Sequence, residues 1–184
     1  MNNWLQDKNV SLRALEPEDL ELLYTIENYP ENWFVGSSTP PYSRYALRQY
    51  IAAQPRDIYD SGEMRLAICA PDGHAVGLLD LINIDPYNLK AEVGIALLAE
   101  ERGKGYARAS LRLLEGFARE NLHLHLLYAY VSRTNNPESR NLFTKAGYTE
   151  SAVLPEWHRR GPAYEDVSVF CRLLSKKSAK ELDG

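Results

Sequence analysis

The chain has 184 residues, of which 45% are hydrophobic and 25% are charged, a composition typical of a folded globular protein. This length suits one hydrophobic core, so we expect a single domain over residues 1–184, with its core in 10–174 and a polar tail in 175–184. The net charge of −4 argues against nucleic acid as a partner and favours a cationic substrate, and no run of about 18 apolar residues predicts a membrane span.

Short apolar strands and amphipathic helices are predicted in the first half of the chain. Pro17 suits the first turn of a helix, and the run at 71–73 is typical of a tight turn between hairpin strands. Residues 31–41, which include Trp33 and Phe34, follow neither a helical nor a strand period and predict an irregular loop. The predicted elements are a strand at 10–15, a helix from 16 to 28–30, a helix at 43–54, and strands at 64–70 and 75–84.

The predicted strand at 90–98 carries the clearest pattern in the second half. Glu92 stands alone as a carboxylate among the small residues Gly94 and Ala96 on one face, opposite a face of apolar side chains. The elements that follow are a helix at 105–120, a strand at 126–131, a helix that begins after Asn136 and ends at Gly147, and strands at 148–154 and 167–173 joined by a connection at 155–166. We expect an α/β fold with a mixed sheet and helices on its faces.

Two features bear on the location of the protein. Cys69 and Cys171 each lie in an apolar run and are interpreted as small buried hydrophobes rather than as redox or metal groups. The amino-terminal segment lacks the apolar stretch of a secretory signal. We therefore expect a cytoplasmic protein that does not contact a membrane.

A glycine-containing loop follows the strand at 90–98. Gly103 and Gly105 let the chain turn sharply, and backbone N–H groups at the start of the next helix would face an anion. Arg102, Lys104 and Arg108 add positive charge that suits a pyrophosphate. A Gly-x-Gly segment by itself is more often a bare turn, and neither a Walker loop nor a Rossmann fingerprint is matched. Taken alone, the loop leaves both interpretations open.

Two motifs in the same order resemble those of a known superfamily. Arg102-x-x-Gly105-x-Ala107 resembles the Q/R-x-x-G-x-G/A motif of the GNAT superfamily of acyl-CoA N-acyltransferases. The segment 136–148 is similar to the superfamily's N-x-x-S/A-x-x-L-Y-x-K-x-G-F pattern. The resemblance covers roughly residues 10–173, and the stretch at 161–170 is similar to the ribosomal-protein and spermidine acetyltransferase branch.

The resemblance implies a fold and a cofactor, acetyl-CoA. It implies a mostly antiparallel sheet of about seven strands, splayed between the strands at 90–98 and 126–131, with helices on both faces and the pantetheine arm of coenzyme A in the gap. Backbone groups of residues 95–97 would pair with that arm and stabilise an oxyanion. The residues expected at the cofactor are Ile95, Ala96, Leu97, Arg102, Gly103, Lys104, Gly105, Tyr106, Ala107, Arg108, Asn136 and Phe143.

Glu92 is the candidate base for such a reaction. A primary amine is mostly protonated at neutral pH and must lose a proton before it attacks a thioester. Many members of the superfamily carry a catalytic glutamate on this strand, although a surface carboxylate without a catalytic role is an equally good interpretation of Glu92. Phe143 departs from the family pattern, because a tyrosine often stands there and protonates the leaving thiolate. Ser139, Tyr148, Tyr130 or a water molecule would have to replace it.

An acceptor site is expected on the other side of the splay. Aromatic side chains beside acids suit a cationic amine. The candidate substrate-binding residues are Trp33, Phe34, Asp80, Tyr130, Glu156 and Trp157. Asn83 stands where spermidine acetyltransferases would carry a second acid. Trp33 and Trp157 have an alternative role, which is ordinary packing of loops on the sheet. His158 is a further candidate, whereas His123 and His125 are interpreted as exposed strand residues and no metal site is expected.

Three functions remain open from the sequence. The first is direct acetylation of a primary amine, such as a polyamine or other small amine. The second is acetylation of a protein amino terminus or lysine. The third is a non-catalytic acyl-CoA-binding module, which is suggested by Phe143 because phenylalanine cannot act as the usual tyrosine acid. The partners expected are an amine-bearing small molecule or a protein amino terminus, together with a second copy of the chain in a homodimer.

Overall fold

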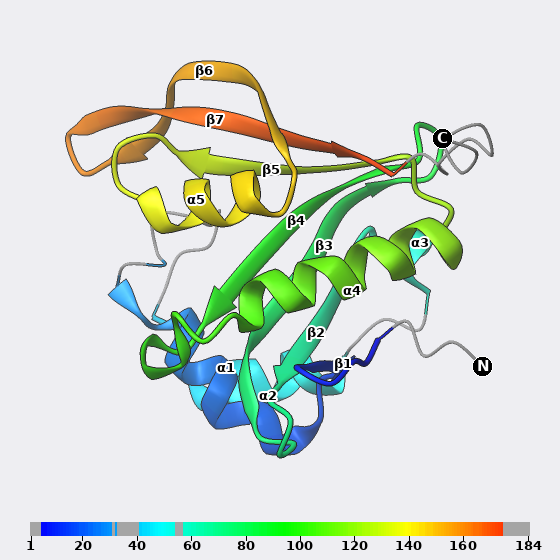
Figure 1. The fold of residues 1–184 in the computed structure, drawn as a ribbon. Coiled ribbons are helices and arrows are strands. Elements are labelled where there is room, and N and C mark those ends of the chain that lie inside the picture. The colour runs from blue at the N-terminus through cyan, green and yellow to red at the C-terminus, as the bar shows by residue number, and fades with distance from the viewer. Residues whose placement is uncertain (1–4, 31, 33–40, 54–56, 175–184) are drawn as a thin grey trace, which may run out of the picture.

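The structure is a computed structural model that describes residues 5–30, 32, 41–53 and 57–174. Its centre is a seven-stranded sheet with the order β1-β2-β3-β4-β5-β7-β6 (Figure 1). The strands are β1 Ser11–Ala14, β2 Met64–Cys69, β3 Ala75–Asp85, β4 Lys90–Leu97, β5 Leu126–Ser132, β6 Thr149–Arg160 and β7 Ala163–Leu173. Neighbouring strands are antiparallel except β4 and β5, which are parallel. The predicted α/β fold with a mixed, mostly antiparallel sheet is confirmed.

The sheet is splayed at its centre. Strands β4 and β5 pair only at Lys90–Leu126, Ala91–Leu127 and Glu92–Tyr128. Beyond Glu92, β4 stays with β3 as far as Leu97, while β5 continues beside β7 to Ser132. The two halves of the sheet therefore separate directly after Glu92, as the ribbon shows between β4 and β5 (Figure 1).

Helices pack on both faces of the sheet. The helical elements are η1 Pro17–Asp19, α1 Leu20–Glu27, α2 Arg44–Ala52, α3 Ile58–Ser61, η3 Ala99–Glu101, α4 Tyr106–Glu120 and α5 Pro137–Lys145. On one face, Leu111 and Leu114 of α4 are buried with Val93 of β4 in the larger core. On the other face, Leu23 of α1 and Leu47 of α2 pack on β2 and β3 in the smaller core. Ala91 and Val93 of β4, on either side of Glu92 in the sequence, belong to the larger core, and Ala96 packs against the smaller one.

Three local predictions differ from the structure. Most of residues 155–166, predicted as a connection, belong to a long β6–β7 hairpin. Most residues of β6 are exposed and none is buried, so the strand lacks the apolar alternation by which a sequence reveals a strand. The helix predicted from 16 begins as the 3-10 turn η1, and the one-turn helix α3 was not predicted.

Two further findings concern the cysteines and the helices. Cys69 and Cys171 are both free thiols, Cys69 buried as predicted and Cys171 only partly buried. No helix in the described part of the chain is long and apolar enough to cross a membrane.

Candidate active site

The glycine loop enters α4 in a conformation that requires glycine. Gly103 and Gly105 have φ angles of +78° and +87°, in the left-handed region that other residues rarely adopt. Gly105 is the N-cap of α4, and no side chain caps this helix by hydrogen bonding. A Cβ atom at either glycine would meet no other atom within 4 Å. The start of α4, with its unpaired N–H groups and positive dipole end, is therefore open to an anion.

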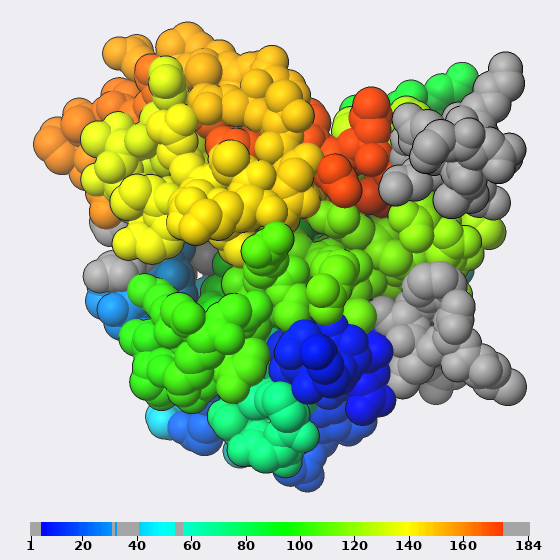
Figure 2. Space-filling model, viewed as in Figure 1, coloured from blue at the N-terminus to red at the C-terminus, as the bar shows by residue number. Residues whose placement is uncertain are grey.

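A cationic cavity of about 670 Å³ lies beside this loop. The basic side chains that line it are Lys104, Arg108, Arg112, Lys145 and Arg172, which come from the loop, α4, α5 and β7. Glu115 is the carboxylate among the lining residues, and burial raises its pKa while Arg172 opposes that shift. The surfaces of α4 (green) and α5 (yellow) adjoin one another in the space-filling view (Figure 2). Three of the five basic side chains already pair with an acid, Lys104 with Glu101, Arg112 with Asp7 and Arg172 with Glu115. The remaining positive charge suits a phosphate group.

Most of the predicted loop residues lie at this anion-accepting end. Arg102, Gly103, Lys104 and Gly105 are exposed, and the Arg102 guanidinium lies over the Tyr29 ring, 5.6 Å from its centroid. Lys104 Nζ also donates to Glu101 Oε2 at 3.0 Å. Arg112, Lys145 and Arg172 were not predicted as site residues. The spacing of Arg108 and Arg112, one helical turn apart, was the available signal for Arg112, whereas Arg172 comes from a distant strand.

One edge of β4 lacks a strand partner beside the splay. Ile95, Ala96 and Leu97 pair with β3 on one edge, but β5 has already diverged on the other. On the paired edge, β3 approaches β4 closely at Gly77, because a Cβ at this position would lie only 2.4 Å from the Ala96 carbonyl oxygen. The unpaired edge offers backbone donors and acceptors to an extended ligand.

Glu92 lies at the point where the strands separate. Its Oε2 accepts a hydrogen bond of 2.8 Å from the Asn83 amide. Asn83 adopts φ +51° at an irregularity in β3, a conformation that asparagine tolerates better than most residues. Burial raises the pKa of Glu92, with smaller opposing effects from Asn83 and from the charge of His158. A half-buried carboxylate with a raised pKa is suited to accept a proton.

Aromatic rings form a cluster on the same face as Glu92. Tyr128 is directly opposite Glu92, and its ring meets that of Tyr130 edge-on at 5.7 Å. Tyr130 in turn stacks against Trp157 at 6.3 Å. Burial, together with the nearby Glu92 carboxylate, raises the pKa of Tyr128 to about 12. We call Tyr128, Tyr130 and Trp157 the aromatic cluster, whose ring faces suit a cation.

Asp80 is engaged by another residue. Arg65 Nε and Nη2 each donate to this carboxylate at 2.8 Å, and Arg65 Nη1 donates to Glu27 Oε1 at 2.6 Å. All three side chains are about four-fifths buried. Asp80 does lie on the face of Glu92, above Gly94, but its charge is neutralised in place by Arg65. Sequence reasoning missed Arg65 because the pairing depends on the β2–β3 register.

The residues of α5 take mainly structural positions. Asn136 Oδ1 accepts the backbone N–H of Ser139 at 3.0 Å and so caps the helix, as predicted. Phe143 was expected at the cofactor, but its ring is 4% exposed and packs edge-on against Tyr148 and beside Phe170. The Phe143 side chain is therefore a core residue. The Tyr148 hydroxyl is buried without a hydrogen-bond partner in the described structure, and burial raises its pKa strongly.

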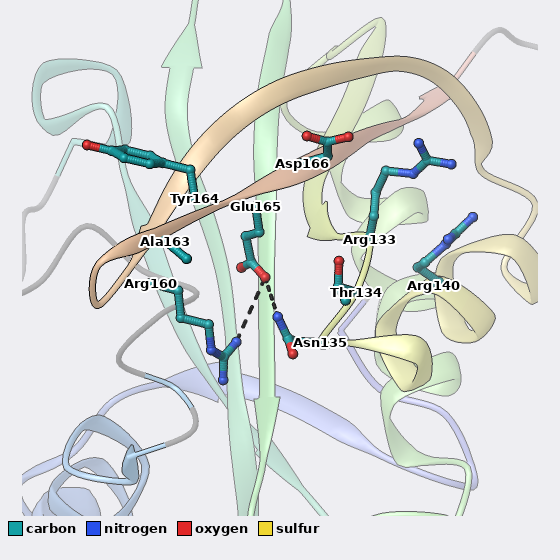
Figure 3. Close-up of a pocket in the computed structure, with 9 residues that line it drawn as sticks. All are labelled: Arg133, Thr134, Asn135, Arg140, Arg160, Ala163, Tyr164, Glu165 and Asp166. Atoms are coloured by element: carbon teal, nitrogen blue, oxygen red, sulfur yellow. Dashed lines mark hydrogen bonds and ion pairs between the residues drawn. The ribbon is translucent and has the colours of Figure 1, made fainter.

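A second cavity, of about 520 Å³, opens at the far end of β5 (Figure 3). Its centre is the buried carboxylate of Glu165, which accepts from Ser132 Oγ at 2.9 Å and from the Asn135 amide. Arg160 Nη1 lies 3.9 Å from the same carboxylate. Glu165 thereby ties β7 to the loop that leads into α5, a contact between distant segments that no local pattern predicted.

The remaining predicted residues are placed as follows. Glu156 is exposed at φ +50°, and its backbone N–H donates to Asp166 Oδ1 at 3.0 Å. Trp33 and Phe34 lie outside the described residues, so their predicted contact with an acceptor stays a prediction. His123 and His125 are exposed, and no group of metal-binding side chains occurs among the residues that the structure describes.

Known proteins resemble this chain over most of its length. A family model described as an acetyltransferase (GNAT) domain matches residues 9–149. A spermidine N(1)-acetyltransferase of Vibrio cholerae is 28% identical, over 92% of this chain and 96% of its own. The crystal structure of spermidine N-acetyltransferase from Vibrio cholerae in complex with CoA and spermine has a TM-score of 0.79 at 29% identity, covering 92% of this chain and 98% of that one. A dodecameric structure of the enzyme from that organism gives 0.75 at 28% identity, covering 95% and 99%.

Proposed function

The chain belongs to the GNAT acetyltransferase family and is an acetyl-CoA-dependent N-acetyltransferase, and we propose that its acceptor is a polyamine or another small cationic amine. The observation that carries this proposal is Glu92, a half-buried carboxylate beside the aromatic cluster at the splay. Carboxylate and ring faces together favour a flexible cation. The similarity to spermidine acetyltransferases supports the same class of acceptor.

The described residues fit acetyl-CoA, which supplies the acetyl group as a thioester. We propose that N–H groups of the loop 102–107 and the first turn of α4 bind the pyrophosphate, because this helix end is uncapped and open. The cationic cavity would neutralise the remaining phosphate. The unpaired edge of β4 at residues 95–97 would bond the pantetheine arm, and Asn136 would contact it at the start of α5.

Glu92 is proposed as the base. It would take a proton from the ammonium group of the acceptor, which frees the nitrogen lone pair to attack the thioester carbon. The raised pKa of Glu92 brings its proton affinity closer to that of the amine, and the Asn83 amide holds one carboxylate oxygen by a hydrogen bond. N–H groups along 95–97 would stabilise the oxyanion that forms on the acetyl oxygen.

Ser139 is proposed as the donor to the leaving thiolate. It lies partly exposed on the first turn of α5, beside the helix cap Asn136. Tyr148 is a poorer donor, because its hydroxyl is buried near Glu115 and Arg172 on the other face of the sheet. A coenzyme A thiolate is a fair leaving group, so only part of the rate depends on this proton.

The acceptor class is tested by thiol release from acetyl-CoA with a panel of amines. Spermidine should give the highest kcat/KM, a monoamine of similar length should give less, and a peptide with a free amino terminus should give the least. Turnover confined to peptides would contradict the small-amine proposal. Binding of acetyl-CoA without turnover of any amine would contradict the assignment of Glu92 and Ser139 to a working site.

We also propose that the chain self-associates, with a homodimer as the smallest unit. Strand β6 is an edge of the sheet, and Val153 and Trp157 on it are 40% and 55% exposed. An edge strand has one row of backbone groups free to pair with another chain. The dodecameric relative supports self-association. Light scattering coupled to size exclusion should give a multiple of 20.9 kDa, and a monomeric mass at micromolar concentration would contradict it.

A further inference from the structure

A row of four polar side chains leads from the β2–β3 turn to the glycine loop. His74 Nδ1 lies 2.5 Å from Asp72 Oδ1, and His74 Nε2 lies 3.8 Å from Glu101 Oε1. The other carboxylate oxygen of Glu101 accepts a hydrogen bond of 3.0 Å from Lys104 Nζ. Lys104 lines the cationic cavity beside the loop. The row Asp72, His74, Glu101 and Lys104 therefore ends at the proposed cofactor site.

Backbone hydrogen bonds hold the two ends of this row together. The N–H of His74 donates to Asp72 Oδ1 at 3.2 Å, which fixes the histidine within the turn. Leu98, directly before η3, donates its N–H to the Val76 carbonyl at 3.0 Å. Val76 follows the turn at the start of β3, so this bond places η3, which ends at Glu101, next to His74.

Glu101 is the buried member of the row. The residue is 9% exposed, and Lys104 is the hydrogen-bond partner of its carboxylate among the described residues. This hydrogen bond raises the pKa of Lys104, so Lys104 stays charged through the neutral range. A buried carboxylate whose counter-charge is withdrawn is strongly unfavourable.

A phosphate on the loop would compete with Glu101 for Lys104. The single positive charge of Lys104 would then face two anions, and the Glu101 carboxylate would need a second cation. His74 is placed to supply it. A neutral imidazole has one N–H and can donate to Asp72 or to Glu101, whereas an imidazolium has two and can donate to both. Histidine is the side chain that changes charge between about pH 5 and 8.

We propose that His74 is a positioning residue for the cofactor loop, which takes up a proton from solvent as coenzyme A binds and then pairs with Glu101, so that Lys104 is released to the phosphate. This inference rests on the proposed binding of the pyrophosphate at residues 102–107. The bound state holds one more proton than the free state. Affinity for the cofactor therefore falls as pH rises through the range in which His74 loses its proton.

Other titratable groups face this row from the surrounding elements. Asp72 shares the turn with His74, and its hydrogen bond with the imidazole lowers the pKa of Asp72. Glu100 of η3 and Tyr106 of α4 act on Lys104. His74 is the residue among them whose type changes charge near neutral pH, so the pH dependence is assigned to it.

Calorimetric titration with dephospho-CoA tests this proposal. The ligand keeps the pyrophosphate but lacks the phosphate monoester, which itself gains or loses a proton at about pH 6. Titrations in buffers of different ionisation enthalpy give the number of protons taken up. At about pH 7.5, binding should take up part of one proton per chain, and the Kd should be several-fold lower at about pH 6 than at about pH 8.5.

Variants of the row assign the effect to its members. His74→Ala should abolish proton uptake and bind at every pH as weakly as the unaltered protein does at high pH. His74→Arg keeps a positive charge and should bind tightly at every pH. Glu101→Gln should also abolish proton uptake, because an amide needs no counter-charge and leaves Lys104 available to the phosphate. His125→Ala, an exposed histidine beyond the other end of α4, should behave as the unaltered protein.

The outcomes separate this inference from the loop assignment on which it rests. If the unaltered protein binds without proton uptake, or if His74→Ala keeps the uptake, the role of His74 is overturned while the loop remains. If Gly105→Glu leaves the affinity unchanged, the loop is not the pyrophosphate site, and the role of His74 falls with it. A purely structural role of His74 would change the affinity equally at every pH and would leave the proton uptake as it was.

Discussion

The Glu92 carboxylate combines burial, an amide partner and a neighbouring imidazole at the place where two strands part. Burial favours its protonated form, and Asn83 and His158 favour the ionised form. Burial has the larger effect, so the pKa of Glu92 lies above the ordinary value for glutamate. A raised pKa makes the carboxylate a stronger base.

Replacing Glu92 by glutamine should separate binding from chemistry. The kcat should fall on the order of 10²-fold or more, because the amide cannot accept the ammonium proton. The KM for acetyl-CoA should stay the same. In the unaltered enzyme, kcat/KM for the amine should rise with pH through the raised pKa of Glu92, and this limb should disappear in the variant. Steady-state kinetics from acidic to neutral pH measure both, with Glu18→Gln, an exposed carboxylate, as the control.

The same substitution should stabilise the fold near neutral pH. The folded-state pKa of Glu92 lies above the unfolded value, so its ionisation opposes folding wherever the carboxylate is charged in both states. Below the unfolded value the group is protonated in both states and the effect vanishes. Glu92→Gln should therefore raise Tm at pH 7, and the gain should shrink as pH falls through the raised pKa. A Tm gain that is equal at every pH would contradict the shift.

The roles of single residues were predicted only where the sequence pattern of a strand made the residue distinct from its neighbours. Glu92 was found because its neighbours on that face are small. Two contacts could not be predicted, because each joins segments far apart in the sequence. They are the ion pair between Arg65 and Asp80 and the hydrogen bond from Asn135 to Glu165. Phe143 was recognised as a departure from the motif, but its burial against Phe170 depends on how α5 packs on β7.

At the scale of elements, the splay and the glycine loop act together. The loop orients the start of α4, and the divergence of β4 from β5 leaves a strand edge exposed in the direction of the loop. The helix at 105–120 and the strand at 90–98 were predicted closely because each has one apolar face, with the period of its own secondary structure. The strands at 148–154 and 167–173 were predicted, but their continuation through most of 155–166 was missed, because solvent-exposed pairing requires no apolar alternation.

Two substitutions at Gly105 should distinguish backbone strain from anion binding. Gly105→Ala places a Cβ in open space at φ +87°, so it should cost about 1 kcal/mol of stability and little affinity for CoA. Gly105→Glu has the same strain and adds a negative charge at the helix start, so it should weaken CoA binding on the order of 10²-fold. Calorimetric titration measures the affinities for CoA, and thermal melts measure the loss of stability caused by the backbone strain. Equal CoA affinity of the two variants would refute the loop as the pyrophosphate site.

At the scale of the whole molecule, the charge is unevenly distributed. The chain carries a net −4, yet five basic side chains from four segments converge on one cavity at the α4–α5 junction. The acidic average suits a cationic acceptor, and the local excess of positive charge suits the phosphates of the acetyl donor. Composition predicted the first, whereas the second depends on the fold.

Ligand-dependent stability should reveal the role of this cavity. CoA should raise Tm, because it binds the folded state alone, and dephospho-CoA should raise it less. Lys145→Ala should weaken CoA binding roughly tenfold, a loss of about 1.4 kcal/mol, and should reduce the difference between the two ligands. Lys8→Ala, at an exposed site, is the matched control. Identical shifts with CoA and dephospho-CoA would show that the cavity does not hold the additional phosphate.

A crystal structure of the enzyme with CoA and the preferred amine tests the proposed site most directly. The pantetheine arm should run between β4 and β5 and bond the backbone of residues 95–97, with the pyrophosphate on the loop 102–107. The nitrogen of the amine should lie within hydrogen-bonding reach of Glu92, directly or through one water molecule. An arm bound outside the splay, or an amine nitrogen remote from Glu92, would contradict the proposed active site.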